Sequence, residues 1–240
     1  MAEFLRAENL TKSFRGLVAN ENINFSIGAG EVCCIIGPNG AGKTTFVSMI
    51  SGHEVPTAGS VWFKGRNITG LPVHRIAQMG VVRKFQTPSV FSELSVYRNI
   101  ELGVLASSCP ARERHGRVLE TLKHVRLSEL SDQRVGSLSH GQRQWLEIGM
   151  LLGKDAQLLL LDEPTAGMTA EETHSTGELI RRLVNELNLS AIIIEHDINF
   201  IRDLRAPVTV LHLGRILMEG SFEEIAGCEE VREVYLGEQK

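Results

Sequence analysis

A glycine-rich loop near the start of the chain has the residue types and spacing that bind nucleotide phosphates. It matches the pattern GxxxxGK[ST] and lies between an apolar run at 31–36, expected to be a strand, and an expected helix at 43–51. Glycines let the backbone curl so that N–H groups point at phosphate oxygens, and the helix adds its positive dipole end. The loop consists of Gly37, Pro38, Asn39, Gly40, Ala41, Gly42, Lys43 and Thr44.

Three side chains at the end of this loop are expected to contact the nucleotide. Lys43 would reach the β- and γ-phosphates, and Thr44 would place its hydroxyl on Mg²⁺. Thr45 is placed to bind the α-phosphate. A plain glycine-rich turn that caps a helix is the alternative, but such a turn does not need the complete pattern between a strand and a helix. The sequence therefore predicts nucleotide binding.

Two adjacent acids follow the most apolar run of the chain. Residues 158–161 are four leucines, and Asp162 and Glu163 come directly after them. A buried strand of a parallel sheet would bring both carboxylates to the sheet edge where nucleotides bind. We expect Asp162 to hold Mg²⁺, through water, and Glu163 to orient the water that attacks the γ-phosphate. Alone, such acids could be structural caps; the phosphate loop upstream favours hydrolysis, because phosphoryl transfer needs a lysine, a metal carboxylate and a water-positioning group together.

The elements that would position these residues alternate between strands and helices. One amphipathic helix is expected after Ser139, because Trp145, Ile148, Gly149 and Leu152 recur at helical spacing. Strands that alternate with helices indicate a parallel sheet covered on both faces. The sequence therefore predicts an α/β fold. The further expected elements are strands at 157–161, 191–194 and 208–211, and helices at about 171–187 and 198–204.

Two regions depart from this alternation. Near the N-terminus, a strand at 23–27 and a hairpin formed by 61–63 and 67–68 predict an antiparallel β subdomain. Between Ser95 and Ser131 the spacing becomes helical and predicts a small helical subdomain. Three apolar residues recur there at three-residue steps, and a proline is expected to open a helix. These residues are Leu119, Leu122 and Val125, and Pro110.

Composition narrows the classes of protein that the chain can belong to. The chain has 240 residues, 42% hydrophobic and 22% charged, which is typical of a globular protein. A net charge of -4 argues against nucleic-acid binding. The apolar runs are far shorter than the roughly 20 residues that cross a bilayer, and no export signal opens the chain, so the cytoplasm is expected. Four cysteines without metal-ligand spacing are expected to be reduced packing residues: Cys33, Cys34, Cys109 and Cys228.

The order of the motifs resembles the ABC ATPase family across essentially the whole chain. After the phosphate loop come Gln86, the sequence Leu-Ser-His-Gly-Gln at 138–142, the Leu-Asp-Glu-Pro of 161–164 and then His196. This resemblance implies a P-loop NTPase core that hydrolyses ATP with Mg²⁺. It also implies one nucleotide-binding domain over 1–240, with a catalytic core of 1–86 and 138–240 and a helical subdomain of 87–137.

The same resemblance implies roles for three further residues. Gln86 looks like the glutamine that contacts Mg²⁺ and the attacking water and relays the nucleotide state to a permease. His196 resembles the histidine that touches the γ-phosphate, where a neutral imidazole can donate a hydrogen bond without carrying charge. Phe14 looks like the aromatic residue that stacks on adenine, although it could equally be a core residue.

The sequence at 138–142 resembles the family's signature motif. Ser139 is expected to cap a helix and to form an anion site with neighbouring N–H groups. In the family this site faces outward and completes the nucleotide pocket of the opposite subunit, so the resemblance implies that Ser139, Gly141 and Gln142 bind the partner's ATP. Two departures concern this interface: His140 replaces the usual glycine, and Thr169 replaces the usual aspartate.

Within the family, three segments resemble importers for branched-chain amino acids and related small polar solutes. The run that follows Ser139 looks closest to the ATP-binding subunit of bacterial urea importers, so the sequence favours urea with branched-chain amino acids as the alternative. Such importers imply a second ATPase subunit, identical or different, permease subunits and an extracytoplasmic solute-binding protein, with this chain on the inner face of the plasma membrane. The segments are 84–91, 166–169 and 234–237.

Three rival interpretations stay open at this point. A soluble ABC ATPase acting on nucleic acid is disfavoured by the negative charge and by the lack of sustained heptads between Gln86 and Ser139. A regulatory cassette that binds ATP without hydrolysis is disfavoured by intact Lys43, Asp162 and Glu163. The third interpretation is the ATPase subunit of an exporter, which this sequence distinguishes from the subunit of an importer only through its resemblance to importer subunits.

Overall fold

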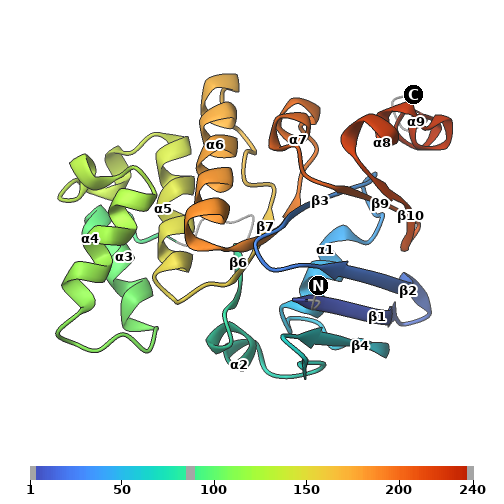
Figure 1. Ribbon diagram of the computed structural model, residues 1–240, viewed down its shortest axis with the longest axis horizontal. Coiled ribbons are helices and arrows are strands. Elements are labelled where there is room, and N and C mark those ends of the chain that lie inside the picture. Colours follow the sequence, from blue (N-terminus) through green and yellow to red (C-terminus); the bar gives the residue numbers. More distant parts are fainter. Residues whose placement is uncertain (1–3, 85–89, 237–240) are drawn as a thin grey trace.

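An antiparallel sheet forms one part of the molecule. The computed structural model describes residues 4–84 and 90–236 (Figure 1). Among them, β1 (Leu5–Phe14), β2 (Leu17–Ile27), β4 (Ala58–Phe63) and β5 (Arg66–Asn67) pair in the order β2-β1-β4-β5. This sheet is the predicted N-terminal β subdomain, with β1 as a strand that the sequence pattern did not reveal.

The second sheet carries the predicted parallel strands. Its order is β10-β9-β3-β8-β7-β6, and every neighbouring pair is parallel except β10 with β9. Every residue of β7 and β8 is buried, as expected for parallel strands covered on both faces. The strands are β3 (Val32–Ile36), β6 (Val81–Lys84), β7 (Leu158–Asp162), β8 (Ser190–Ile194), β9 (Val208–His212) and β10 (Arg215–Gly220).

Helices and the antiparallel sheet cover the two faces of this parallel sheet. Alternate residues of a strand point to opposite faces, so Leu158 and Leu160 join the core shared with the antiparallel sheet and α1, whereas Leu159 and Leu161 join the core beneath α5 and α6. The helices are α1 (Lys43–Ile50), α2 (Val73–Gln78), α3 (Val96–Leu105), α4 (Arg114–His124), α5 (His140–Leu152), α6 (Ala170–Leu187), α7 (Ile198–Leu204), α8 (Phe222–Gly227) and α9 (Glu229–Leu236), with short 3₁₀ turns at Ser128–Leu130 and Val135–Ser137. Among the described residues, none of these helices is long and apolar enough to cross a membrane.

The helix indicated by the spacing of 119, 122 and 125 is present as α4, although these residues do not all face the core, and the predicted role of Pro110 is wrong. Leu119 is 47% exposed, and the buried face of α4 is instead made by Val118, Thr121 and Leu122. Steps of three residues drift off one face of a helix with 3.6 residues per turn, so position 118 shares the face of 122 and 125 and position 119 does not. Pro110 does not open α4, because a turn closed by the Glu113 N–H donating to the Pro110 carbonyl at 2.9 Å precedes the helix.

The cysteines are free thiols, as predicted. Cys33 and Cys34 lie on β3 and are buried, and Cys109 and Cys228 are partly buried. Burial is the main cause that raises the pKa of the Cys33 thiol to about 12, and it raises the pKa of Cys34 as well. Both thiols of β3 are therefore protonated near neutral pH and serve as packing residues.

A buried ion pair joins the end of β6 to α5. Lys84 Nζ lies 3.4 Å from Glu147 Oε2, and both side chains are almost fully buried. Because a charge left alone in the interior is costly, we predict that Glu147→Gln lowers the free energy of unfolding by about 3 kcal/mol. Glu101→Gln, which removes the acid of an exposed pair with Arg98 on α3, should cost less than about 1 kcal/mol. Urea denaturation would measure both values, and equal losses would contradict the prediction.

Candidate nucleotide-binding site

The glycine-rich loop leaves β3 at Gly37 and enters α1 at Lys43. Gly37 and Gly42 have φ of 152° and 98°, so their backbones are in a region that other residues rarely adopt. A Cβ at Gly37 would lie 2.1 Å from the Leu211 carbonyl oxygen, and one at Gly42 would lie 2.4 Å from that of Ala19. Neighbouring backbone therefore requires glycine at both positions, which explains the spacing of the motif.

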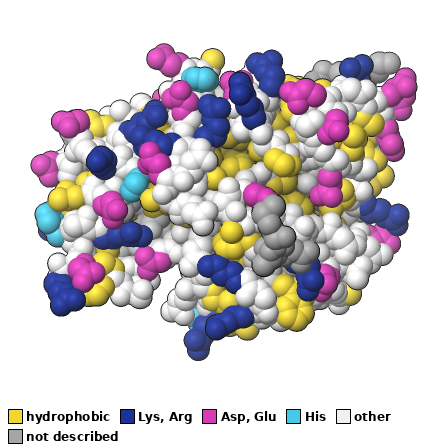
Figure 2. Space-filling model, viewed as in Figure 1, with side chains coloured by type: hydrophobic (Ala, Val, Ile, Leu, Met, Phe, Trp, Pro, Cys, Tyr) yellow, Lys and Arg dark blue, Asp and Glu magenta, His cyan; other side chains and the backbone are white. Residues whose placement is uncertain are grey.

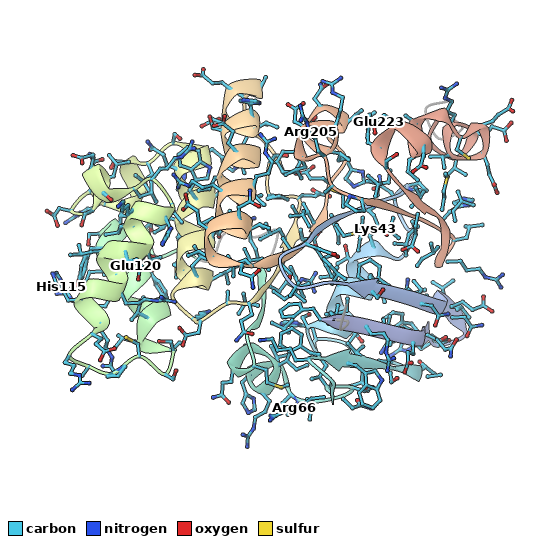
Figure 3. The ribbon with its side chains drawn as sticks, in the orientation of Figure 1. Lys43, Arg66, His115, Glu120, Arg205 and Glu223 are labelled. Atoms are coloured by element: carbon cyan, nitrogen blue, oxygen red, sulfur yellow. The ribbon has the colours of Figure 1, made fainter. Side chains whose placement is uncertain are left out.

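Lys43 reaches back across this loop. Its side chain is buried, with 7% of the residue exposed, and Nζ donates to the carbonyl oxygens of Gly37 at 2.6 Å and Pro38 at 2.9 Å. Figure 3 labels it where α1 begins. Thr44 is exposed and Thr45 is partly buried on the first turn of that helix. The ammonium thus lies within the loop that would receive phosphate oxygens.

The two adjacent acids stand at the carboxyl end of β7, as predicted. Asp162 is 1% exposed, and its Oδ2 accepts a hydrogen bond from Arg83 Nη2 at 3.0 Å. Its other oxygen, Oδ1, is buried and has no hydrogen-bond partner among the described residues. A buried carboxylate oxygen without a partner fits a Mg²⁺ ion with its bound water, so the residues present suit the metal.

Glu163 begins the loop that follows β7. Its φ is 48°, which is unusual for a residue with a side chain, and its N–H donates to the Ile194 carbonyl at 2.9 Å. This conformation turns Glu163 toward His196, and the distance from Oε1 to His196 Nε2 is 3.5 Å. The predicted water-positioning acid and the predicted histidine are therefore neighbours at one sheet edge.

Two charged residues that the sequence analysis missed hold this arrangement together. Arg83 on β6 donates to Ser48 Oγ of α1 at 2.7 Å as well as to Asp162. Glu195, which is 3% exposed, accepts from the N–H of Thr165 through one oxygen and from the N–H of His196 through the other, both at 2.9 Å. The only signal for them in the sequence is a charge inside or directly after an apolar strand run.

The other predicted nucleotide contact, Phe14, is at the surface. It ends β1 and is 40% exposed, and Lys12 Nζ lies 4.7 Å from the centroid of its ring. This exposure excludes the alternative that Phe14 is a core residue and leaves its ring accessible for stacking. Gln86 lies outside the described residues.

The sequence at 138–142 forms the expected helix cap. Ser139 is exposed and caps α5 in a capping box with Gln142, while Gly141 is buried on the first turn. His140 Nε2 lies 2.9 Å from the Ala166 carbonyl oxygen, in the loop after Glu163. Figure 1 shows α5 and α1 apart in the molecule, so the cap of α5 and the phosphate loop do not share one pocket within this chain.

The fold and the site together define a nucleotide-hydrolysing protein with a P-loop, and comparison with known proteins identifies its family. The family model described as ABC transporter matches residues 20–166. The chain is 34% identical to the high-affinity branched-chain amino acid transport ATP-binding protein BraF of Pseudomonas aeruginosa, over 98% of each chain. It is 35% identical to the lipopolysaccharide export system ATP-binding protein LptB of Acidithiobacillus ferridurans, over 100% of this chain and 99% of LptB.

Solved structures agree. The ADP conformation of MJ1267, an ATP-binding cassette of an ABC transporter, is 29% identical, covers 99% of this chain and 100% of its own, and superimposes with a TM-score of 0.89. The ATP-binding cassette MJ0796, solved as a dimer in a post-hydrolysis state with ADP and Pi, is 25% identical with a TM-score of 0.78, over 91% and 98% of the two chains. The chain belongs to the ABC transporter family, as an ATP-binding subunit. It is an ATPase, and its nucleotide is ATP bound with Mg²⁺.

The position of Lys43 generates a direct test of the phosphate loop. We predict that Lys43→Ala weakens ATP binding by at least about tenfold, because the only buried ammonium described in the loop is lost from the phosphate site. Isothermal titration with ATP would measure the affinity. Lys64→Ala, which removes an exposed lysine from the turn between β4 and β5, is the control and should leave the affinity unchanged. An unaltered affinity in Lys43→Ala would contradict the assignment.

Proposed function

We infer that this chain is the ATPase subunit that energises an ABC importer for branched-chain amino acids. The observation that carries the ATPase part is the pair Glu163 and His196, 3.5 Å apart beside the buried carboxylate of Asp162. A metal carboxylate and a group that orients water are among the groups that phosphoryl transfer needs, and Asp162 and Glu163 would supply them beside His196 at one sheet edge.

Each of these residues has a distinct task in hydrolysis. Lys43 exchanges its two loop carbonyls for phosphate oxygens and holds the nucleotide in place. Thr44 and Gln86, with Asp162 acting through water, would hold Mg²⁺, which would supply positive charge to neutralise the phosphates. Glu163 accepts a hydrogen bond from the attacking water and orients it, and His196 donates a hydrogen bond from its ring to the γ-phosphate. Phe14 stacks on the adenine.

The nucleotide pocket is completed by a second cassette. In Figure 1, α5 lies apart from α1, which the phosphate loop enters, so the residues at the start of α5, Ser139, Gly141 and Gln142, contribute to a pocket only across a dimer interface. The dimeric MJ0796 structure supports such an assembly. We place a second ATPase subunit, identical or different, opposite this chain, and two permease subunits above the pair.

The helical subdomain of 87–137 is the surface that we assign to the permease, with 1–86 and 138–240 as the catalytic core. The chain then lies in the cytoplasm on the inner face of the plasma membrane, and an extracytoplasmic solute-binding protein delivers the solute. We expect no nucleic-acid partner, since the net charge is -4 and basic and acidic side chains are interspersed on the face seen in Figure 2.

The relatives favour branched-chain amino acids over urea as the solute. BraF is named for branched-chain amino acids, and the match to it extends along almost the whole of both chains. The similar identity to LptB, an export protein, shows that identity alone does not set the direction of transport. Import is supported by the resemblance of the segments at 84–91 and 166–169 to importer subunits. No residue of this chain contacts the solute in such an assembly.

Hydrolysis by Glu163 has a direct test. We predict that Glu163→Gln binds ATP as tightly as the wild type and releases phosphate at least about a hundredfold more slowly, because an amide does not accept the proton of the attacking water as a carboxylate does. Phosphate release and ATP titration would measure the two effects. Glu171→Gln, an exposed acid on α6, is the control and should hydrolyse normally. Equal turnover in Glu163→Gln and the wild type would remove Glu163 from the mechanism.

The solute is tested by uptake in the native cell. In a deletion strain under nitrogen limitation, we expect the uptake of labelled leucine at low external concentration to fail and that of labelled urea to continue. Wild-type protein should restore leucine uptake, and Glu163→Gln should not, because it assembles without hydrolysing ATP. Loss of urea uptake alone would replace the proposed solute by urea and leave the ATPase intact.

A further inference from the structure

The signature motif of this chain holds an anion that belongs to the chain itself. Glu172, the third residue of α6, accepts from Ser139 Oγ at 3.0 Å and from the Gly141 N–H at 3.2 Å, both through Oε1. These two donors belong to the group that receives the partner's γ-phosphate in the proposed dimer. The carboxylate therefore occupies donors that the nucleotide needs.

The other oxygen of Glu172 has a separate task. Its Oε2 accepts from the N–H of Thr169 at 3.1 Å and completes the capping box of α6. Because the two oxygens serve different helices, the contact with α5 can break while the cap of α6 remains. The pKa of Glu172 is lowered, first by the hydrogen bond from the Thr169 backbone and next by that from Ser139, so the group is a carboxylate at neutral pH.

We propose that Glu172 is a further residue of the ATPase site, an internal substitute for the γ-phosphate that must leave Ser139 and Gly141 when the partner's ATP arrives. This inference rests on the proposed function, since it requires a second cassette that presents its nucleotide to the signature motif. Exchange of one anion for another keeps the donors of α5 satisfied in both states. It also makes ATP compete with Glu172 for them, which weakens the apparent affinity for ATP.

The variant Glu172→Gln, which removes the negative charge of this side chain, distinguishes competition with the γ-phosphate from a purely structural role in capping α6. Glutamine at this position retains the capping box of α6, since Glu and Gln both serve there. Because glutamine has one oxygen, which stays with the cap, the NH₂ group is left facing Ser139 and Gly141, and an amide NH₂ donates hydrogen bonds but does not accept them. Glu172→Gln should therefore give way to the γ-phosphate more readily than the wild type.

Glu171 offers a matched control. It is exposed in the same turn of α6 and carries the same charge, and its side chain makes no hydrogen bond or ion pair within the described part of the chain. Glu171→Gln therefore changes the general electrostatic field near the interface as much as Glu172→Gln does. Only Glu172→Gln releases the donors of α5.

The experiment uses the transporter assembled from this chain, its partner cassette and the permease, and measures ATP hydrolysis as a function of ATP concentration. We expect Glu172→Gln to lower KM for ATP roughly three- to tenfold and to change kcat by less than about twofold, because only competition with ground-state binding is removed. Glu171→Gln should keep the wild-type KM and melting temperature, whereas Glu172→Gln, which loses its hydrogen bonds to α5, should melt somewhat below the wild type without ATP and stay folded at the assay temperature.

Two results would overturn the inference. The first is an equal KM for ATP in Glu172→Gln and Glu171→Gln, found together with hydrolysis that depends on Glu163. This result would show that Glu172 only caps α6, and it would leave the proposed function standing. If the chain does not assemble with a permease, or if hydrolysis does not depend on Glu163, the proposed function and this inference are both wrong.

Discussion

The site depends on the register of three parallel strands. Within the sheet, Asp162 of β7 pairs with Ile194 of β8, and Ile35 of β3 pairs with the same Ile194. The residues that follow each strand therefore emerge at one level: the phosphate loop after β3, Glu163 after β7 and His196 after β8. A shift of one residue in either pairing would turn side chains to the opposite face and separate these groups.

This register creates an electrostatic problem, because the sheet edge collects acids in a buried environment. Asp162 and Glu195 are almost fully buried, and an isolated buried carboxylate is costly. Each is compensated locally: Arg83 pairs with Asp162, and backbone N–H groups on both sides of the site donate to Glu195. The hydrogen bonds of Glu195 therefore also join the loop after β7 to the segment after β8, and this contact fixes the spacing of Glu163 and His196.

Much of this fold and site could be predicted from the sequence. The predictions succeeded at positions where a single physical requirement explains the residue type. The glycines of the phosphate loop, the leucines of β7 and the cap of α5 are of this kind. The strand β1 was missed because charged residues interrupt it and its pairing with β2 shifts register, so its apolar residues do not alternate regularly. Arg83, Glu195 and Glu172 were missed because each has a partner in a distant segment, namely Asp162, Thr165 and Ser139, and no local spacing indicates a long-range polar contact.

The departure at His140 shows how the signature motif is tied to hydrolysis. A carbonyl oxygen only accepts hydrogen bonds, so the contact with Ala166 places the proton of His140 on Nε2. Ala166 lies three residues after Glu163, and the α6 cap that holds Glu172 follows in the same loop. The middle of this loop and the helix turn that follows it are thus both connected to the start of α5, the first through His140 and the second through Glu172. In the proposed dimer, a partner's phosphate bound at Ser139 would therefore have a short, continuous route to Glu163, the acid that we propose to orient water in this chain's own pocket.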